Sequence, residues 1–346
     1  MTFGRIRRWL TGILIALLLV LSGLYAWSYW PISANIDATD PAVTLANKLG
    51  GKGQKYREGY IESQGQQIHY ISAGEGEPIV FLHGFPSYWF TMFGLMEEFK
   101  SDYQVIAIDG LGVGKSDAPS DVDAYKVDKL VGHVENVINE LGFEKVHLVG
   151  HDWGAALATG YAQTNPSKTH TLTAIGALPH NILLHRLDTD PEYREIFSYM
   201  SLFKSANPVL IRLMGVKEQI WTDTYAPFVE KGLITKQQGE RLYEDIGQPR
   251  RTDRFINWYR ANFPEFDDIT ENDFWPSRHV RITVPALFIY GENDRVVTKD
   301  LASDFKNSAD AMRVLSLKNT DHRPHFERKD VVVAAIRELI EKQKKP

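Results

Sequence analysis

Residues 145–155, KVHLVGHDWGA, decide the fold of this chain. The apolar run VHLV predicts a buried strand, and the stretch that follows the corner, GAALATGYAQTN, predicts a helix. Gly150 and Gly154 flank Asp152, because a strand that turns sharply into a helix brings the two backbones close together. The pattern predicts that Asp152 is a nucleophile on a strained turn. The alternative is an N-cap of the following helix, a position where aspartate is common.

Strand-like and helical stretches alternate along the chain after residue 55. Residues 125–142 are one of the helical stretches, with apolar residues at helical spacing on one face. This alternation predicts an α/β fold, a mostly parallel and twisted sheet with helices on both faces. The strand-like runs are EGYIES, QQIHYISAG, PIVFLHG, YQVIAID, KVHLVG, HTLTAIGAL, PALFIYG and MRVLSLKN.

The interval 181–281 interrupts this alternation with aromatic-rich amphipathic stretches, such as PEYREIFSYMSLFK, NPVLIRLMGVKEQIW and RTDRFINWYRANF. We interpret it as a helical cap over the strand ends, where open α/β folds bind their ligands. The predicted organisation is an N-terminal tip and anchor at 1–30, a linker at 31–55, a first part of the core at 56–180, the cap at 181–281 and a second part of the core at 282–346.

The N-terminal segment is a separate unit. Arg5, Arg7 and Arg8 precede a charge-free run, residues 9–30, that is long enough to cross a bilayer core of roughly 30 Å as a helix. We interpret this run as a single-pass membrane anchor, and a cleaved secretory signal is the alternative. The basic residues before the run predict a cytoplasmic N-terminus and an extracytoplasmic body, periplasmic or lumenal. Aromatic residues suited to the two membrane interfaces are Trp9, Tyr25, Trp27, Tyr29 and Trp30.

The composition excludes several classes of protein. A formal net charge of -5 lacks the basic excess of a nucleic-acid binder. The chain has no cysteine, so disulfide scaffolds, thiolate zinc sites and cysteine nucleophiles are excluded. At 346 residues it is long enough for one large α/β domain with an insertion.

Two further motifs supply partners for Asp152. The motif GENDRVV follows a strand-like run and contains Asp294, and DHRPHFE follows the next run and contains His322. Nucleophile, acid and histidine therefore occur in the chain order of a hydrolase triad, with Asp294 orienting His322 as the general base. The alternatives are His325 for the base and Glu292 or Asn293 for the acid.

The motif HGFP, residues 83–86, follows the third strand-like run. The loop after that strand is expected to donate one backbone N–H to an oxyanion hole, and the residue after the nucleophile donates the second. This assigns the amides of Phe85 and Trp153. An ordinary Gly-Pro turn is the alternative. His83 and His151 are expected to be structural histidines bonded to nearby backbone.

These motifs resemble those of the α/β-hydrolase fold family over residues 56–343, and within it the epoxide hydrolase branch. The Asp-Trp pair at 152–153 is typical of epoxide hydrolases and haloalkane dehalogenases together. The resemblance implies that two cap tyrosines hold the epoxide oxygen, and it matches Tyr199 in SYMSLFKSANP and Tyr259 in NWYRANF to them. It also implies conversion of an epoxide and water to a vicinal diol through an ester on Asp152, with no metal or organic cofactor.

Some residues depart from the pattern of this branch. Asp321 stands where glycine often precedes the histidine. The loop DGLGVGKSD lacks the arginines of haloacetate dehalogenases, which disfavours substrates that carry a carboxylate. Phe85 stands where many haloalkane dehalogenases have a halide-binding asparagine, which disfavours dehalogenation.

Two alternatives for the function therefore remain. A haloalkane dehalogenase would use the same Asp152, Asp294 and His322 on carbon–halogen bonds. A membrane-tethered binding protein without activity would retain the fold alone. The aromatic cap and the anchor favour a small lipophilic epoxide as the substrate.

Overall fold

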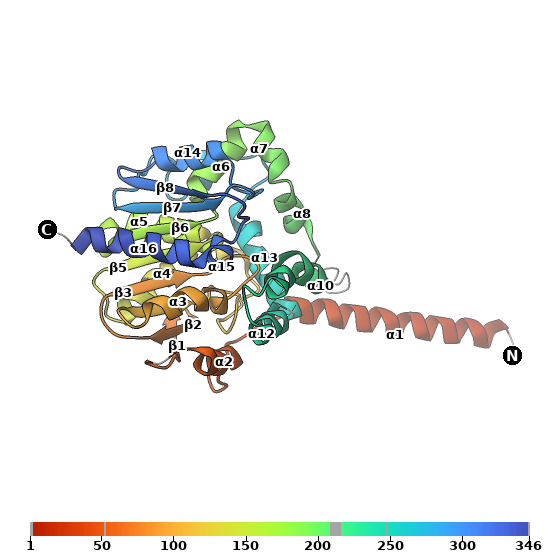
Figure 1. Cartoon of the computed structure of the whole chain (residues 1–346). Helices are drawn as coiled ribbons and strands as arrows, with labels where there is room; N and C mark the ends of the chain where they lie inside the picture. Colours follow the sequence, from red (N-terminus) through yellow and green to blue (C-terminus); the bar gives the residue numbers. More distant parts are fainter. Residues whose placement is uncertain (1–2, 52, 208–215, 247, 345–346) are drawn as a thin grey trace.

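The computed structural model describes residues 3–51, 53–207, 216–246 and 248–344 of the chain. An eight-stranded sheet lies at its centre, in the order β1-β2-β4-β3-β5-β6-β7-β8 (Figure 1). β2 pairs antiparallel with β1 and β4, and all other neighbours pair parallel. This confirms the mostly parallel α/β sheet. The strands are β1 (Arg57–Ser63), β2 (Gln66–Ala73), β3 (Pro78–Leu82), β4 (Gln104–Ile108), β5 (Val146–His151), β6 (Thr169–Ile175), β7 (Ala286–Gly291) and β8 (Met312–Leu317).

Helices cover both faces of the sheet, α3 and α16 on one face and α4 and α5 on the other (Figure 1). Every residue of β5 and β7 is buried, as expected of strands with helices on both sides. The bounds of the core helices are α3 (Phe93–Phe99), α4 (Val127–Glu140), α5 (Trp153–Thr164), α14 (Lys299–Asn307), α15 (Pro324–Glu327) and α16 (Lys329–Lys344). Short 3₁₀ helices occur at Trp89–Met92, Val122–Tyr125, Pro166–Lys168 and Glu271–Asp273.

The described residues between β6 and β7 form a series of helices and no named strand. The cap boundaries at 181 and 281 remain a prediction, and part of one expected amphipathic stretch, residues 208–215, lies outside the described residues. The elements are α6 (His180–Thr189), α7 (Pro191–Ile196), α8 (Tyr199–Ser205), α10 (Val216–Ile220), a π-helical turn (Trp221–Tyr225), α11 (Ala226–Glu230), α12 (Lys236–Ile246) and α13 (Pro249–Asn262).

The predicted strand run PALFIYG corresponds to β7, which begins one residue later than the run. Ile282 makes only an isolated bridge to Ala309, and β7 begins at Ala286. Pro285 precedes the strand and has no N–H to donate, which suits the start of a strand but not its interior.

The N-terminal helix α1 (Phe3–Tyr29) extends away from the body on the side of α10 and α12 (Figure 1). Its segment Trp9–Trp27 is long and apolar enough to cross a membrane, and none of that segment is buried. The side chains of Arg5, Arg7, Arg8 and Tyr29 lie outside the described residues. The membrane span and its orientation remain predictions.

The segment predicted as a linker contains a packed helix, α2 (Pro41–Leu49). Asp40 caps it through a bond from the amide of Ala42, 2.8 Å, and also accepts the indole N–H of Trp89 at 2.7 Å. The interpretation of residues 31–55 as a linker and approach segment did not anticipate this helix. The overlooked signal was an aspartate followed by proline at the first helical position.

Close packing at the strand-to-helix corner predicts that Gly154→Ala destabilises the protein. A Cβ atom at residue 154 would lie 2.1 Å from the carbonyl oxygen of Leu82, so the backbones must separate. We expect the free energy of unfolding to fall by about 1–3 kcal/mol in urea titrations of the detergent-solubilised protein. Gly94→Ala, where a Cβ would have ordinary contacts, is the control and should be neutral or slightly stabilising. Equal effects of the two changes would contradict this account.

Candidate active site

Asp152 lies at the corner between β5 and α5 in a conformation that side chains rarely adopt, φ 53° and ψ -125°. Its side chain makes no capping bond to the helix, which argues against the N-cap alternative. Gly84 lies directly beside it, since a Cβ atom there would be 2.3 Å from the Cβ of Asp152. The corner therefore holds the carboxylate in one fixed position, at the expense of local backbone strain.

A backbone amide holds one oxygen of the Asp152 carboxylate. The N–H of Phe85 donates to Oδ1 at 2.7 Å, and the amide of Trp153 also acts to lower the pKa of this carboxyl group. His83 braces the loop of Phe85, since its Nδ1 lies 3.2 Å from the carbonyl of Gly84 and its Nε2 accepts the amide of Gly110 at 3.1 Å. These contacts bear out the expectation that His83 is structural. The two amides predicted as an oxyanion hole thus both act on this carboxylate.

His322 lies at the other oxygen of this carboxylate. Its Nε2 is 3.4 Å from Oδ2 of Asp152, and its Nδ1–H donates to Oδ2 of Asp294 at 2.9 Å. The side chain of Asp294 is fully buried, and its Oδ1 accepts the amide of Val296 at 2.8 Å. The loop after β7 thus fixes the carboxylate that orients the imidazole.

The electrostatics of this group are strongly coupled. Burial raises the pKa of Asp152, but the hydrogen bond and charge of His322 and the amides of Phe85 and Trp153 outweigh it and hold the pKa below its ordinary value. Burial lowers the pKa of His322, but the charge of Asp294 and hydrogen bonds to Asp152 and Asp294 raise it to about 9. At neutral pH the site therefore holds an ionised aspartate beside an imidazolium.

The alternatives to Asp294 and His322 lie elsewhere. Glu292 and Asn293 are exposed, and Glu292 bonds the hydroxyl of Ser316 instead. His325 is buried against His151, with ring centroids 4.3 Å apart, and neither of its ring nitrogens has a hydrogen-bond partner among the described residues.

The residues next to His322 fix its backbone. His151 bonds the carbonyl of His322 through Nε2 at 3.0 Å, which agrees with its expected structural role. Asp321, the residue that departs from the family pattern, accepts the backbone N–H of His322 at 2.8 Å. The loop that carries His322 is therefore held on both sides.

Tyr199 on α8 and Tyr259 on α13 line one cavity together with Asp152 and Trp153. Their ring centroids are 6.4 Å apart. Burial raises the pKa of both tyrosines, and the negative charge of Asp152 raises each further. Both therefore remain protonated hydrogen-bond donors at neutral pH. The structure thus brings together all seven residues that the sequence nominated, and their catalytic roles remain predictions.

Sequence reasoning missed the residues that position α13. Asp253 is buried and pairs with Arg254 at 2.8 Å and with Arg260 at 3.0 Å. The indole of Trp258 donates to the carbonyl of Leu111 at 2.9 Å and anchors the helix on the core. The stretch RTDRFINWYRANF contained a signal for this, because charged residues lie among the aromatic residues of the face expected to be buried. In the part of the chain that the structure describes, no group of three or more potential ligands is arranged to hold a metal ion.

Comparison with known proteins agrees with this geometry. Residues 77–329 match the family model described as alpha/beta hydrolase fold. The chain is 30% identical to mouse epoxide hydrolase 4 over 70% of its length and 67% of that protein, and 32% identical to mouse epoxide hydrolase 3 over 68% of its length and 62% of that protein. It thus spans about two thirds of the length of these relatives.

A solved structure of an epoxide hydrolase is also similar to this chain. A variant epoxide hydrolase from Bacillus megaterium, complexed with its diol product, is 26% identical with a TM-score of 0.74, over 82% of this chain and all of that one. A sheet of this order, a strained strand-to-helix corner at Asp152 and helices inserted after β6 define a class of hydrolase. The chain belongs to the α/β-hydrolase fold family, and within it to the epoxide hydrolase branch.

The raised pKa of His322 predicts a specific pH dependence of stability. Its folded-state pKa of about 9 lies above the value of about 6.5 for an unfolded histidine. The stabilisation from the protonated ring is therefore complete below about pH 6.5 and is lost as the pH rises through about 9. Urea unfolding of the wild type and His322→Gln should show a stability difference that shrinks over this range.

The matched control is His279→Gln, because the side chain of His279 is exposed. The difference in the free energy of unfolding between wild type and His322→Gln should shrink with rising pH. A difference that stays constant or widens would contradict the presence of a protonated His322 in the folded protein.

Proposed function

We propose that this protein hydrolyses epoxides to vicinal diols through a covalent ester on Asp152. One observation carries the proposal: an ionised carboxylate lines the same cavity as two protonated tyrosines, with its Oδ1 held by the amide of Phe85 and its Oδ2 3.4 Å from Nε2 of His322. An ionised aspartate attacks saturated carbon without a base, whereas a serine does not. The names of the relatives, epoxide hydrolases 3 and 4, support the same substrate class.

In the first step, Oδ2 of Asp152 attacks an epoxide carbon and the ring C–O bond breaks. Tyr199 and Tyr259 donate hydrogen bonds to the oxygen as its negative charge grows, and the oxygen gains a proton. The product is a hydroxyalkyl ester. Because the ester is uncharged, the pKa of His322 loses the contribution of the Asp152 carboxylate and falls.

Because its pKa falls, His322 can act as a base only after the ester has formed. The proton that the imidazolium releases balances the proton that the alkoxide takes up. In the second step His322 removes a proton from water, and the hydroxide attacks the ester carbonyl carbon of Asp152. The amides of Phe85 and Trp153 bind the oxyanion. When it collapses, the ester C–O bond breaks and the leaving alkoxide takes the proton held by His322, which gives the diol. The regenerated carboxylic acid then passes its proton to His322, so that the starting state returns. The scheme uses no metal or organic cofactor.

We further propose that α1 is a single-pass membrane anchor with a cytoplasmic N-terminus and an extracytoplasmic catalytic body. The charge-free segment after Arg5, Arg7 and Arg8 supports this assignment. An anchored enzyme would meet lipophilic epoxides where they concentrate. Impermeant biotinylation of lysines in intact cells tests the orientation, and labelling only after lysis would overturn it.

The two-step scheme predicts that two variants stop the reaction at different steps. Asp152→Ala should form neither ester nor diol. His322→Gln should consume one equivalent of epoxide and stop, because hydrolysis lacks its base. Mass spectrometry of the peptide that contains residue 152 should then show the mass of the epoxide added, whereas His279→Gln should turn over normally. If His322→Gln never carries an adduct, the ester mechanism is wrong.

Substitution of the two tyrosines should distinguish epoxide hydrolysis from haloalkane dehalogenation. Tyr199→Phe and Tyr259→Phe should each lower kcat/KM for epoxides by about a hundredfold, because a donor to the developing alkoxide is lost. Tyr243→Phe, on the cap helix α12 and away from this cavity, is the control and should have no effect. Halide release from bromoalkanes that exceeds diol formation from epoxides would favour the dehalogenase alternative instead.

A further inference from the structure

One peptide group, between Gly84 and Phe85, carries the amide that holds the Asp152 carboxylate. The N–H of Phe85 donates to Oδ1 of Asp152 at 2.7 Å. This peptide is trans, so its carbonyl, on Gly84, lies on the opposite side from the N–H. A group that binds this carbonyl therefore acts on the same peptide from behind the site.

Two side chains donate hydrogen bonds to the carbonyl of Gly84. The hydroxyl of Ser87 donates to it at 2.5 Å. Nδ1 of His83 lies 3.2 Å from the same oxygen, and it carries the ring proton because Nε2 accepts the amide of Gly110. His83 was already assigned to bracing the loop. The catalytic scheme gives Ser87 no role.

Ser87 has one proton to donate, and its neighbours leave that proton for the carbonyl behind the site. Ser87 is buried, with the hydroxyl of Thr91 at 3.3 Å and that of Tyr225 also close. Each of these hydroxyls has a backbone carbonyl of its own to donate to: Tyr88 accepts from Thr91 at 2.9 Å, and Pro86 accepts from Tyr225 at 3.0 Å. The short bond of Ser87 is therefore well determined.

Tyr225 holds the same loop through a different peptide. The carbonyl of Pro86, which accepts its hydroxyl, shares a peptide group with the N–H of Ser87 and not with that of Phe85. The bond from Tyr225 therefore steadies the loop without acting on the amide beside Asp152. Ser87 and Tyr225 thus make similar bonds to one loop, with different expected consequences for the reaction.

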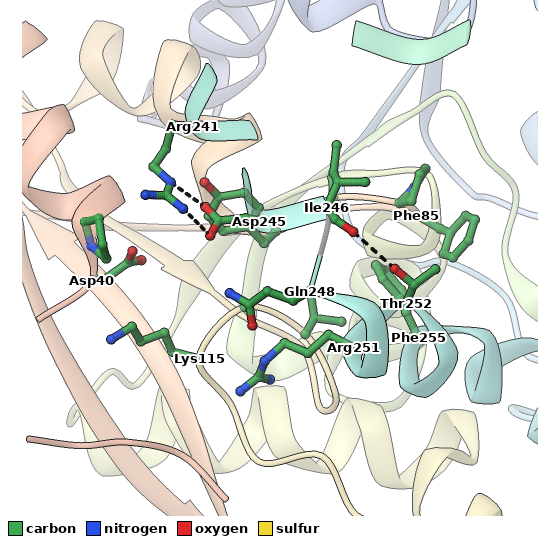
Figure 2. Close-up of a pocket in the computed structure, with 16 residues that line it drawn as sticks. Asp40, Phe85, Lys115, Arg241, Asp245, Ile246, Gln248, Arg251, Thr252 and Phe255 are labelled. Atoms are coloured by element: carbon green, nitrogen blue, oxygen red, sulfur yellow. Dashed lines mark hydrogen bonds and ion pairs between the residues drawn. The ribbon is translucent and has the colours of Figure 1, made fainter. Parts of the chain in front are cut away.

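The loop also borders a second cavity, of about 140 Å³, between the core and helices α12 and α13. Figure 2 shows Phe85 on one side of this cavity and Asp40 on the opposite side. Ser87 lines it, and among the described residues it shares no lining residue with the cavity at Asp152. A substrate at Asp152 would therefore not touch Ser87, which can act on the reaction only through the loop.

Hydrogen bonds at the two ends of one peptide strengthen each other, because each polarises the group that makes the other. The bond from Ser87 therefore makes the N–H of Phe85 a stronger donor. In the first proposed step negative charge leaves Asp152, so a stronger donor stabilises the starting carboxylate and gives no acceleration. In the second step Oδ1 is the ester carbonyl oxygen and gains negative charge, so a stronger donor lowers the barrier.

We propose that Ser87 is a positioning residue for ester hydrolysis, whose hydroxyl strengthens the Phe85 amide as an oxyanion donor through the peptide that the two ends share. This role rests on the proposed two-step mechanism. It assigns to Ser87 an effect on the second step alone, whereas a side chain that only held the loop in shape would affect both steps.

The kinetic test uses the full-length protein in detergent micelles with styrene oxide as the probe. Rapid quenching and mass spectrometry of the peptide that contains residue 152 give the rates at which the ester forms and decays. In Ser87→Ala the decay should slow by about threefold or more, while ester formation is no slower than in the wild type. The fraction of protein that carries the ester at steady state should therefore rise. Proportional slowing of both steps, or no change in either, would overturn the proposal.

Two further variants separate the hydrogen bond from the packing of the loop. Ser87→Cys nearly retains the shape of the side chain but donates only weakly, so its ester should decay at a rate closer to that of Ser87→Ala. Ester decay at the wild-type rate in Ser87→Cys would show that packing alone matters and would overturn the proposal. Tyr225→Phe removes a donor to the same loop, and its ratio of the two rates should remain that of the wild type. A change in this ratio equal to that of Ser87→Ala would also overturn it.

The same measurements distinguish failure of this role from failure of the proposed function. If the wild type and all variants form diol without ever carrying an ester, the two-step mechanism fails and the role of Ser87 fails with it. If the ester forms and decays in the wild type but Ser87→Ala retains the wild-type ratio of rates, only the role of Ser87 is wrong.

Discussion

The structure depends on one constraint, that Asp152 stays ionised although it is enclosed by the core and the inserted helices. Burial alone would raise the pKa of this carboxylate, and a protonated acid is a poor nucleophile. The amides of Phe85 and Trp153 and the imidazolium of His322 offset that cost. The strained backbone at the corner, the glycines packed around it and the buried Asp294 all serve to hold these groups in place.

Helix α13 connects the candidate active site with the N-terminal segment. It carries Tyr259 into the cavity at Asp152, and Arg254 holds the end of α1 through the carbonyl of Trp30. The buried pairs of Asp253 with Arg254 and Arg260 fix the helix, and breaking such a pair leaves a buried charge uncompensated. A displacement of this one helix would therefore alter the cavity at Asp152 and the contact with the N-terminal segment together.

The same charges that activate Asp152 also restrain His322. In the proposed mechanism the imidazole keeps its proton while the aspartate is ionised, and it becomes a base only when alkylation removes the neighbouring charge. The order of the two proposed steps then follows from electrostatics rather than from movement of the chain. His151 and His325, whose pKa values burial lowers far below the ordinary range, add no competing charge next to this pair.

The sequence by itself determined the alternation of strands and helices, the corner at Asp152 and the order of the triad, because these depend on the spacing of neighbouring residues. It favoured Asp294 over the adjacent Glu292 and Asn293, and the folded loop agrees with that choice because Asp294 is buried against His322 while both neighbours are exposed. It also missed α2, whose cap Asp40 accepts the indole N–H of Trp89, and the bond from the indole of Trp258 to the carbonyl of Leu111. Those features arise where segments distant in the chain pack together, and local periodicity carries no information about which distant side chains meet.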